Sequence, residues 1–344
     1  MSDTRDLEAR ARVAAQGDDD ESPYHAGERA VQARLGVRAR AEQMGRHMIH
    51  DVITEQQRAF FATLPFVLTG SVDRAGHPWA SMLVGPPGFV LPLDEHLLSL
   101  RAHALPGDPL ARALRPGEPL GLLGIELETR RRNRLNGRIS AVSDAGFTLR
   151  VDQSFGNCPM YITARAPLAT EALAANAPRA EGAHLSQVAK ACIAASDTCF
   201  IASASAAVAE LADPREGVDV SHRGGRPGFV RATEHERGSV LTLPDFSGNN
   251  AFNTLGNLAR YPRAGLLFPD FETGNLLLVT CSAEIVFDGP EVRAFRGAQR
   301  LIRLYVAHGF YYERALPFRW SPARPAAQLA KTGSWDDTED PVER

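Results

Sequence analysis

The stretch Gly85-Pro86-Pro87-Gly88-Phe89-Val90 returns 140 residues later in the chain as Gly225-Arg226-Pro227-Gly228-Phe229-Val230. Two further pairs of matches keep the same order. Gly121-Leu122-Leu123, followed by Glu126 to Thr129, is echoed by Gly265-Leu266-Leu267, followed by Asp270 to Thr273, and Phe66-Val67 upstream is echoed by Phe200-Ile201. Ordered matches of this kind indicate two diverged copies of one unit. A duplicated unit implies a pseudo-two-fold interface inside one chain, where a ligand site is natural, and the differences between the copies indicate which half carries the chemistry.

The segments around these matches predict short strands joined by tight turns. Phe66–Val72 is expected to be a strand, residues 73–77 a turn with Gly76 at positive φ, and Trp79–Val84 the hairpin partner. Thr54 with Gln57 predicts a helix start. Further helices are expected over 28–46, 108–114, 186–195, near 251–259 and over 292–308. The fold class is therefore mostly β with short helices, as about six strands per copy in a small antiparallel β-barrel, an α+β arrangement.

The composition divides the chain into five expected segments. They are a disordered tail over 1–22, an N-terminal barrel domain over 23–165, an Ala-rich linker over 166–185, a C-terminal barrel domain over 186–320, and a frayed tail over 321–344. The C-terminal domain is expected to carry the ligand site.

Charge and hydropathy exclude several classes of protein. The chain has 344 residues, 44% hydrophobic and 23% charged, with a net charge of −3, which argues against a nucleic-acid binder. No run approaches the about 18 apolar residues that a transmembrane helix needs, and the charged N-terminus has no apolar core of a secretion signal. The scattered cysteines predict free thiols and a cytoplasmic protein. The histidines show no metal-ligand spacing, and no nucleophile or general-base motif assigns a catalytic residue.

The second copy contains a polar group of residues that the first copy lacks. Where the first has Ser81-Met82-Leu83-Val84-Gly85, the second has Ser221-His222-Arg223-Gly224-Gly225. Arginine and histidine side chains beside two glycines can hold a phosphate through charge and exposed N–H groups. Gly248-Asn249-Asn250 is expected to begin a helix and add free N–H donors, with Asn253 on the same face as Asn249. These residues predict a phosphate site. The alternative is a tight glycine turn with surface caps.

The second concentration of charge is Arg130-Arg131-Arg132-Asn133-Arg134, at the expected tip of a long hairpin. It is either a solvated turn or a tip that reaches across the pseudo-two-fold to a ligand. Cys158, in Gly156-Asn157-Cys158-Pro159, has no basic neighbour in the sequence and is expected to be inert.

At this point the chain resembles a known family, the flavin-binding split barrels. It is similar to pyridoxamine 5'-phosphate oxidase-related FMN-binding proteins of the duplicated kind, over roughly residues 23–320. The resemblance rests on Gly76-x-Pro78, Ser221 to Gly225, Gly248 to Asn250 with Asn257 and Pro262, His25-x-Gly27-Glu28, Thr129 to Gly137, and Gln153 to Pro159.

The resemblance implies two tandem FMN-binding split barrels that form an intrachain pseudo-dimer, with FMN at the barrel–barrel interface. His222, Arg223, Gly224 and Gly225 would then lie near the flavin phosphate, with Ser221 in the same strand. Asn249, Asn250 and Asn253 would lie beside them, and the first copy would bring Arg131 or Asn136 near the cofactor. The related oxidases carry Ser and Lys at the helix start. This chain has no Lys there, so Arg223 must supply most of the charge.

The expected function is that of an FMN-dependent oxidoreductase acting on an unknown small molecule. Electrons would pass to or from a separate donor or acceptor, and a second copy of the chain is a further candidate partner. The alternatives are a non-catalytic flavin or haem binding or sensing protein on the same fold, with His222 as the axial ligand for haem, and a reductase that uses a deazaflavin.

Overall fold

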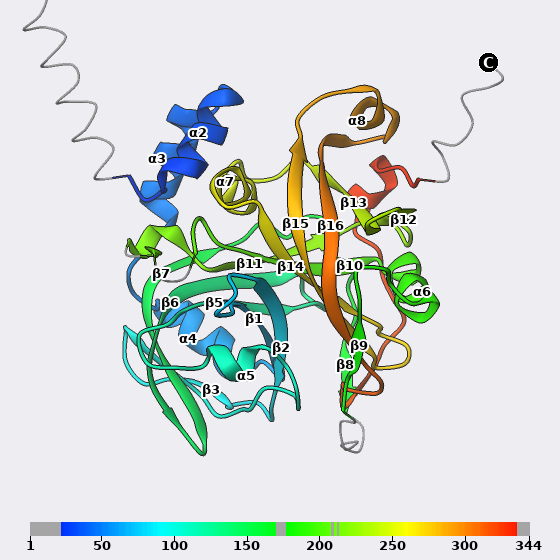
Figure 1. Cartoon of the computed structure of the whole chain (residues 1–344). Coiled ribbons are helices and arrows are strands. Elements are labelled where there is room, and N and C mark those ends of the chain that lie inside the picture. The colour runs from blue at the N-terminus through cyan, green and yellow to red at the C-terminus, as the bar shows by residue number, and fades with distance from the viewer. Residues whose placement is uncertain (1–21, 170–176, 208–209, 212, 336–344) are drawn as a thin grey trace, which may run out of the picture.

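The computed structural model describes residues 22–169, 177–207, 210–211 and 213–335 of the chain. The described part is mostly β with short helices, as expected, and is built on two separate antiparallel sheets (Figure 1). Residues 1–21 of the expected N-terminal tail, 170–176 of the expected linker and 336–344 of the expected C-terminal tail lie outside the described residues.

The first sheet has the strand order β2-β1-β5-β6-β7-β4-β3. Its strands are β1 (Phe66–Val72), β2 (Pro78–Val84), β3 (Val90–Pro92), β4 (Leu97–Leu100), β5 (Pro119–Glu126), β6 (Arg131–Ser143) and β7 (Gly146–Gly156). The hairpins predicted around Gly76 and between 88 and 100 are present, and Gly76 has a φ of 79°.

The second sheet has the order β11-β10-β14-β15-β16-β13-β12, and a further strand, β9 (Arg179–Glu181), pairs with β16. Its strands are β10 (Thr198–Ser203), β11 (Asp219–Gly224), β12 (Arg231–His235), β13 (Gly238–Phe246), β14 (Arg263–Pro269), β15 (Leu276–Val286) and β16 (Ala298–Tyr312). Taken in chain order, the seven strands of this path follow the same sequence of neighbours as those of the first sheet. The internal duplication read from the sequence is therefore a duplication of topology.

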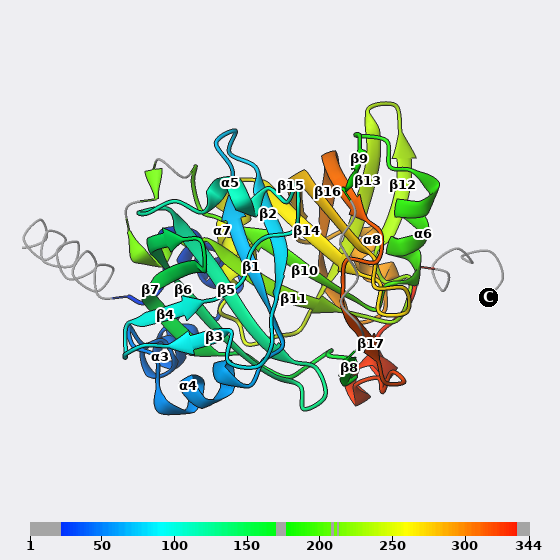
Figure 2. The same cartoon turned by 90° about the horizontal axis from the view of Figure 1, so that it is seen from below.

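The helices lie around the two sheets (Figures 1 and 2). They are α2 (Ala26–Arg34), α3 (Arg38–Met48), α4 (Glu55–Ala62), α5 (Leu110–Ala113), α6 (Gln187–Ala195), α7 (Asn253–Arg260) and α8 (Pro290–Ala294), with 3₁₀ turns η2 (Pro214–Glu216) and η3 (Ala327–Lys331). A small separate pair is formed by β8 (Pro167–Ala169) and β17 (Phe318–Trp320). The predicted capping box of Thr54 and Gln57 begins α4. No helix among the described residues is long and apolar enough to cross a membrane.

The repeated sequence stretches occupy the same place in both sheets. Gly85 and Gly225 each follow the second strand of their unit, where a Cβ would lie 2.4 Å from the Phe89 ring and 2.3 Å from the Phe229 ring. Only glycine leaves room for the phenylalanine four residues on. Gly88 and Gly228 have φ values of 92° and 79°, a conformation that glycine adopts without cost. The repeated pattern is therefore a turn that packs its own aromatic ring.

The two sheets meet in a nearly symmetric contact. A Cβ on Gly121 of β5 would lie 2.3 Å from the carbonyl oxygen of Val218, just before β11. A Cβ on Gly265 of β14 would lie 2.3 Å from the carbonyl oxygen of Pro78, at the start of β2. One apolar cluster draws on both units, with Phe66, Leu68, Trp79 and Leu123 from the first and Phe200, Val220, Leu267 and Leu278 from the second. The halves therefore share a buried core.

Three expectations about helices and tails were wrong. The helix expected over 292–308 is mainly strand β16, in which Ile302, Leu304 and Val306 are buried and the intervening residues are not, the period of two of a strand. The helix expected over 28–46 is two helices, separated at Gly36 with φ of 70°. The chain after Trp320 was expected to fray, yet Trp335 is buried and its indole N–H donates to the Phe229 carbonyl at 2.9 Å.

Candidate functional site

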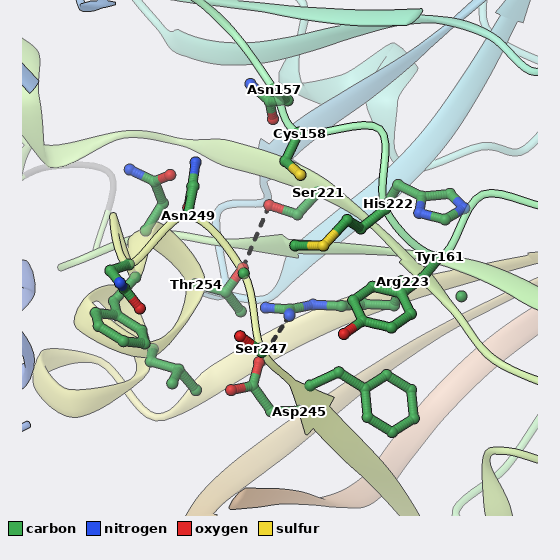
Figure 3. Close-up of a pocket in the computed structure, with 18 of the residues that line it drawn as sticks. Asn157, Cys158, Tyr161, Ser221, His222, Arg223, Asp245, Ser247, Asn249 and Thr254 are labelled. Atoms are coloured by element: carbon green, nitrogen blue, oxygen red, sulfur yellow. Dashed lines mark hydrogen bonds and ion pairs between the residues drawn. The ribbon is translucent and has the colours of Figure 1, made fainter. Parts of the chain in front are cut away.

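A pocket of about 130 Å³ lies where β6 of the first unit meets β11, β13 and α7 of the second. Three arginines line it, Arg132, Arg134 and Arg223, and Figure 3 shows Arg223 with several of the polar side chains around it. The lining comes from three parts of the chain: Arg132, Arg134 and the segment Asn157 to Tyr161, without Pro159; Ser221 to Gly224; and Pro244 to Leu255, without Ala251.

The charge on Arg223 is only partly balanced. One of its terminal nitrogens donates to Asp245 Oδ1 at 2.8 Å (Figure 3), and Arg300 Nε donates to Asp245 Oδ2, also at 2.8 Å. A single carboxylate thus serves two guanidinium groups. Arg223 Nε is buried and has no hydrogen-bond partner among the described residues. Since a buried unpaired donor is costly, this arrangement favours an additional acceptor in the pocket.

Arg134 is held by a buried carboxylate that joins the two halves. It donates to Asp219 Oδ1 at 2.9 Å, and both side chains are almost fully buried. Asn136 of the first unit and Asn257 of α7 each donate to the same carboxylate at 2.8 Å. Arg134 also donates to Ser221 Oγ at 2.5 Å. Because Asp219 accepts hydrogen bonds from both units, this network fixes the orientation of β6 relative to β11.

Arg132 lines the pocket without a carboxylate. Its Nε donates to the Cys158 carbonyl oxygen at 2.7 Å, and no described acidic side chain forms an ion pair with it. Burial, with the like charges of Arg134 and Arg223, lowers the pKa of Arg132 to about 9. A bound anion would raise the pKa of Arg132 again, because an opposite charge nearby favours the protonated guanidinium. The pocket therefore carries positive charge in excess.

The start of α7 adds backbone donors to the same wall. Its N-cap, Phe252, has φ of 60° and supplies no side-chain cap, and Asn250 also has a positive φ, at 61°. Asn253, Thr254 and Leu255, the first residues of the helix, all line the pocket. An uncapped helix start presents free N–H groups and the positive end of the helix dipole. This feature and Arg132 point to the same kind of ligand, an anion.

Helix α2 closes the outer side of α7 (Figure 1). A Cβ on Gly27 would lie 2.2 Å from the Gly256 carbonyl oxygen, so the helices touch through backbone. Their contact places the buried Glu28 carboxyl within hydrogen-bond distance of the Asn253 amide. Burial and the nearby Asp219 carboxylate raise the pKa of Glu28 well above its usual value, and burial lowers the pKa of His25 to about 4. The N-terminal segment thus supports the pocket wall with side chains that favour their neutral forms.

Most of the residues expected at a phosphate site do line this pocket. The structure brings together Ser221, His222, Arg223, Gly224, Asn249, Asn250 and Asn253. The expected helix start at Gly248–Asn250 is instead a loop, because α7 begins only at Asn253.

His222 and Gly225 differ in detail from the expectation. His222 is buried, with its ring edge to face on Phe200 at a centroid distance of 5.7 Å, and Figure 3 shows it directed away from the guanidinium of Arg223. Burial and three nearby arginines lower its pKa well below the usual value. Gly225 does not line the pocket, and its N–H donates to the Asp197 carbonyl at 3.0 Å. The expected cluster is therefore divided: the His222 ring lies on the opposite face of β11 from Arg223, because successive strand residues face opposite sides, and Gly225 lies beyond the end of the strand.

The residues expected from the first unit do not line this pocket. Arg131 is exposed and lies over the Phe60 ring, and Asn136 is buried against Asp219. The contributing arginines are Arg132 and Arg134, which the sequence indicated only as members of the basic cluster 130–134 and not as single site residues. Strand alternation could have indicated them. Residues 132, 134 and 136 share one face of a strand, whereas residues 131 and 136 lie on opposite faces and cannot both meet one ligand. Asp245 was also missed, since nothing in its local sequence indicates its pairing with Arg223.

A second cleft, of about 680 Å³, adjoins the pocket. Both are lined by Arg132, Asn157, Cys158 and Asn249. The remaining walls of the cleft come from α3, the start of α4 and the β5–β6 turn, and include Met44, Met48, His50, Arg130 and Arg131. The small cationic pocket therefore opens into a larger space beneath the N-terminal helices.

Comparison with known proteins gives little beyond this geometry. No family model matches the chain, and no curated protein matches it. Among solved structures, a histidine-to-alanine variant of Group A Streptococcus HupZ matches with a TM-score of 0.28 and 13% identity, over 37% of this chain and 98% of that chain. Another HupZ structure from Group A Streptococcus matches with a TM-score of 0.27 and 14% identity, over 36% of this chain and 89% of that one. Matches this distant carry no argument about function.

Proposed function

We propose that this chain is a tandem split-barrel flavoprotein that binds FMN in the arginine-lined pocket and acts as an oxidoreductase. The observation that carries the proposal is Arg132, a cation with no acidic partner among the described residues, facing the uncapped start of α7. A phosphate group fits this donor set, because guanidinium groups and helix N-terminal N–H groups are its ordinary partners in proteins. Arg132, Arg223 and the first turn of α7 would hold it.

The space available supports a ligand with a small anionic end and a larger body. The pocket of about 130 Å³ is smaller than the roughly 300 Å³ of a typical small-molecule site. The adjoining cleft of about 680 Å³ would take the flavin ring system and ribityl chain. Bound FMN supplies hydride or single-electron transfer, chemistry that the protein tunes through hydrogen bonds and charge.

In this proposal the residues of the chain bind and orient. Arg134 and Asp219 keep β6 and β11 in register, so that the two arginines facing the pocket have fixed positions. Asp245 holds Arg223 from behind and leaves its Nε for an anion. A small-molecule substrate would enter from the adjoining cleft, and a separate donor or acceptor would exchange electrons. No described side chain is assigned as a general acid or base.

The test is the absorbance spectrum of the purified full chain, with any released cofactor identified by mass. A flavin band near ~450 nm and a released mass equal to that of FMN are expected. The paired variant Arg223→Ala with Asn250→Ala should lose the band while keeping the fold, monitored by circular dichroism. A Soret band near ~400 nm would favour the alternative of a haem-binding protein. A colourless chain that takes up no added FMN would refute the proposal.

A further inference from the structure

The pseudo-two-fold assigns a counterpart to the cleft beside the cationic pocket. Gly121 pairs with Asn136 across β5 and β6, and Gly265 pairs with Thr280 across β14 and β15. This register makes Leu276 and Leu278 the equivalents of Arg132 and Arg134. Thr129, in the cleft beside the pocket, is equivalent to Thr273, which lines a separate cleft of about 1060 Å³. Each half of the molecule thus has one cleft at the same relative place.

The positions equivalent to Arg132, Arg134 and Arg223 are leucines, and none of the three lines this second cleft. Leu276 and Leu278 are fully buried in the apolar cluster that both units share. Leu83, which corresponds to Arg223, is also fully buried. With leucines in place of these three arginines, the counterpart is not a second copy of the proposed phosphate site.

The outer part of the second cleft is walled by aromatic rings. Trp320 contacts Phe271 edge to face at a centroid distance of 4.9 Å and Phe318 at 5.8 Å. The three rings meet at steep angles, 80° and 71° for these pairs. A planar group set against one ring would therefore meet the edge of another, an arrangement that aromatic pairs favour. Trp320 Nε1 is buried, without a hydrogen-bond partner within the described residues, so this corner also holds an unused donor.

Three arginines surround this aromatic corner. Arg165 is buried, is paired at both terminal nitrogens with Asp197, and lies 4.0 Å from the centre of the Phe271 ring. Arg314 and Arg319 are exposed, and neither forms an ion pair with any described acidic group. Arg314 has a φ of 50°, and its N–H donates to Asn275 Oδ1 at 2.8 Å. This hydrogen bond to Asn275 stabilises an otherwise unfavourable backbone conformation at Arg314, which lines the cleft.

We infer that this second cleft, lined by Phe271, Phe318, Trp320, Arg314 and Arg319, binds a small planar aromatic carboxylate. The rings would take its aromatic face, and the rim arginines would take its anionic end. The inference does not depend on FMN, because the cleft shares no lining residue with the cationic pocket.

Fluorine NMR of the chain labelled with 5-fluorotryptophan provides a test with residue resolution. The chain has three tryptophans, and single Trp→Phe variants assign their signals. The probes are 1-naphthoate and its uncharged analogue 1-naphthalenemethanol. We expect naphthoate to shift the Trp320 signal and leave the Trp335 signal in place. The uncharged analogue should bind about tenfold more weakly, as expected from the loss of about 1.4 kcal/mol of charge interaction.

The variant Arg314→Gln with Arg319→Gln tests the anionic end. It should weaken naphthoate binding about tenfold, and added salt should weaken the wild type similarly. Arg293→Gln, another exposed arginine far from the cleft in sequence, serves as the matched control and should change nothing. Naphthoate that leaves the Trp320 signal unmoved, or that shifts the Trp335 signal equally, would overturn the inference. Equal affinity for the uncharged analogue, or for the double variant, would also overturn it.

Discussion

Arg132→Gln should weaken FMN binding without lowering the stability of the unliganded chain. Arg132 would bind the phosphate of FMN, whereas its unpaired charge destabilises the folded chain when no ligand is bound. A hydrogen bond between a guanidinium and a phosphate contributes about 2 kcal/mol, so FMN affinity should fall about 30-fold. Riboflavin, which lacks the phosphate, should bind both proteins equally. Arg150→Gln is the matched control, since Arg150 is an exposed arginine of the same unit that lines neither the pocket nor the adjoining cleft.

The same substitution should not lower the free energy of unfolding of the unliganded chain. Burial and the like charges of Arg134 and Arg223 lower the pKa of Arg132 to about 9, which corresponds to an upper limit of about 5 kcal/mol of unfavourable interaction. Solvent screening of this partly exposed group reduces that figure, and loss of the bond to Cys158 O costs about 1 kcal/mol. We therefore expect the free energy of unfolding to stay constant or rise by up to about 2 kcal/mol.

The assays are flavin fluorescence titrations with FMN and riboflavin, and urea unfolding of the cofactor-free chain. The reasoning is refuted if FMN affinity is unchanged, or if riboflavin affinity falls by the same factor. A large loss of stability in the variant would also contradict it, because Arg132 would then be a structural residue.

Three further predictions concern stability. Burial raises the pKa of Asp108 to about 6, so the folded chain favours the protonated carboxyl. The stability that depends on this proton is fully present below about pH 4 and is lost as the pH rises through 6. In urea unfolding, the free energy of unfolding of Asp108→Asn minus that of the wild type should therefore increase by about 3 kcal/mol from about pH 4 to pH 7. A difference that stays constant with pH would contradict this prediction. Gly265→Ala should cost about 2–4 kcal/mol by overpacking the interface in the same assay, whereas Gly182→Ala, with open space around it, should be neutral; equal effects would exclude this explanation. Trp335→Ala should lower stability by about 3 kcal/mol, and an unchanged melting temperature would show that this segment does not anchor to the sheet.

The fold could be predicted from the sequence where a local pattern is compatible with a single secondary structure. Alternating residues, glycines at turns and the capping box of Thr54 are of this kind, and the repeated stretches predicted the duplicated topology. The long strand β16 was misread because Arg, Leu and Ala in residues 298–307 also suit a helix, and only its burial against β13 and β15 decides for a strand.

The candidate site was predictable only in part. The loop and helix of the second unit were found because several polar residues stand together in sequence. The first unit's contribution depends on which face of β6 meets β11, and the choice of Arg131 and Asn136 ignored strand parity. Asp245, which Arg223 shares with Arg300, lies on another strand, 22 residues further along the chain. Partners of this kind are set by tertiary packing, and no local pattern records them.

The near-symmetric contacts of Gly121 and Gly265 also bear on how such a molecule can change over evolutionary time. In a homodimer of identical chains, every substitution is made twice, and an arginine that suits one side of the axis must be buried on the other side too. Joining the copies in one gene removes that constraint. Arg134 and Leu278 occupy equivalent places, a combination that no symmetric pair of identical chains can contain. The glycines remain alike because backbone contact leaves them no alternative, while the side chains around them have become free to specialise.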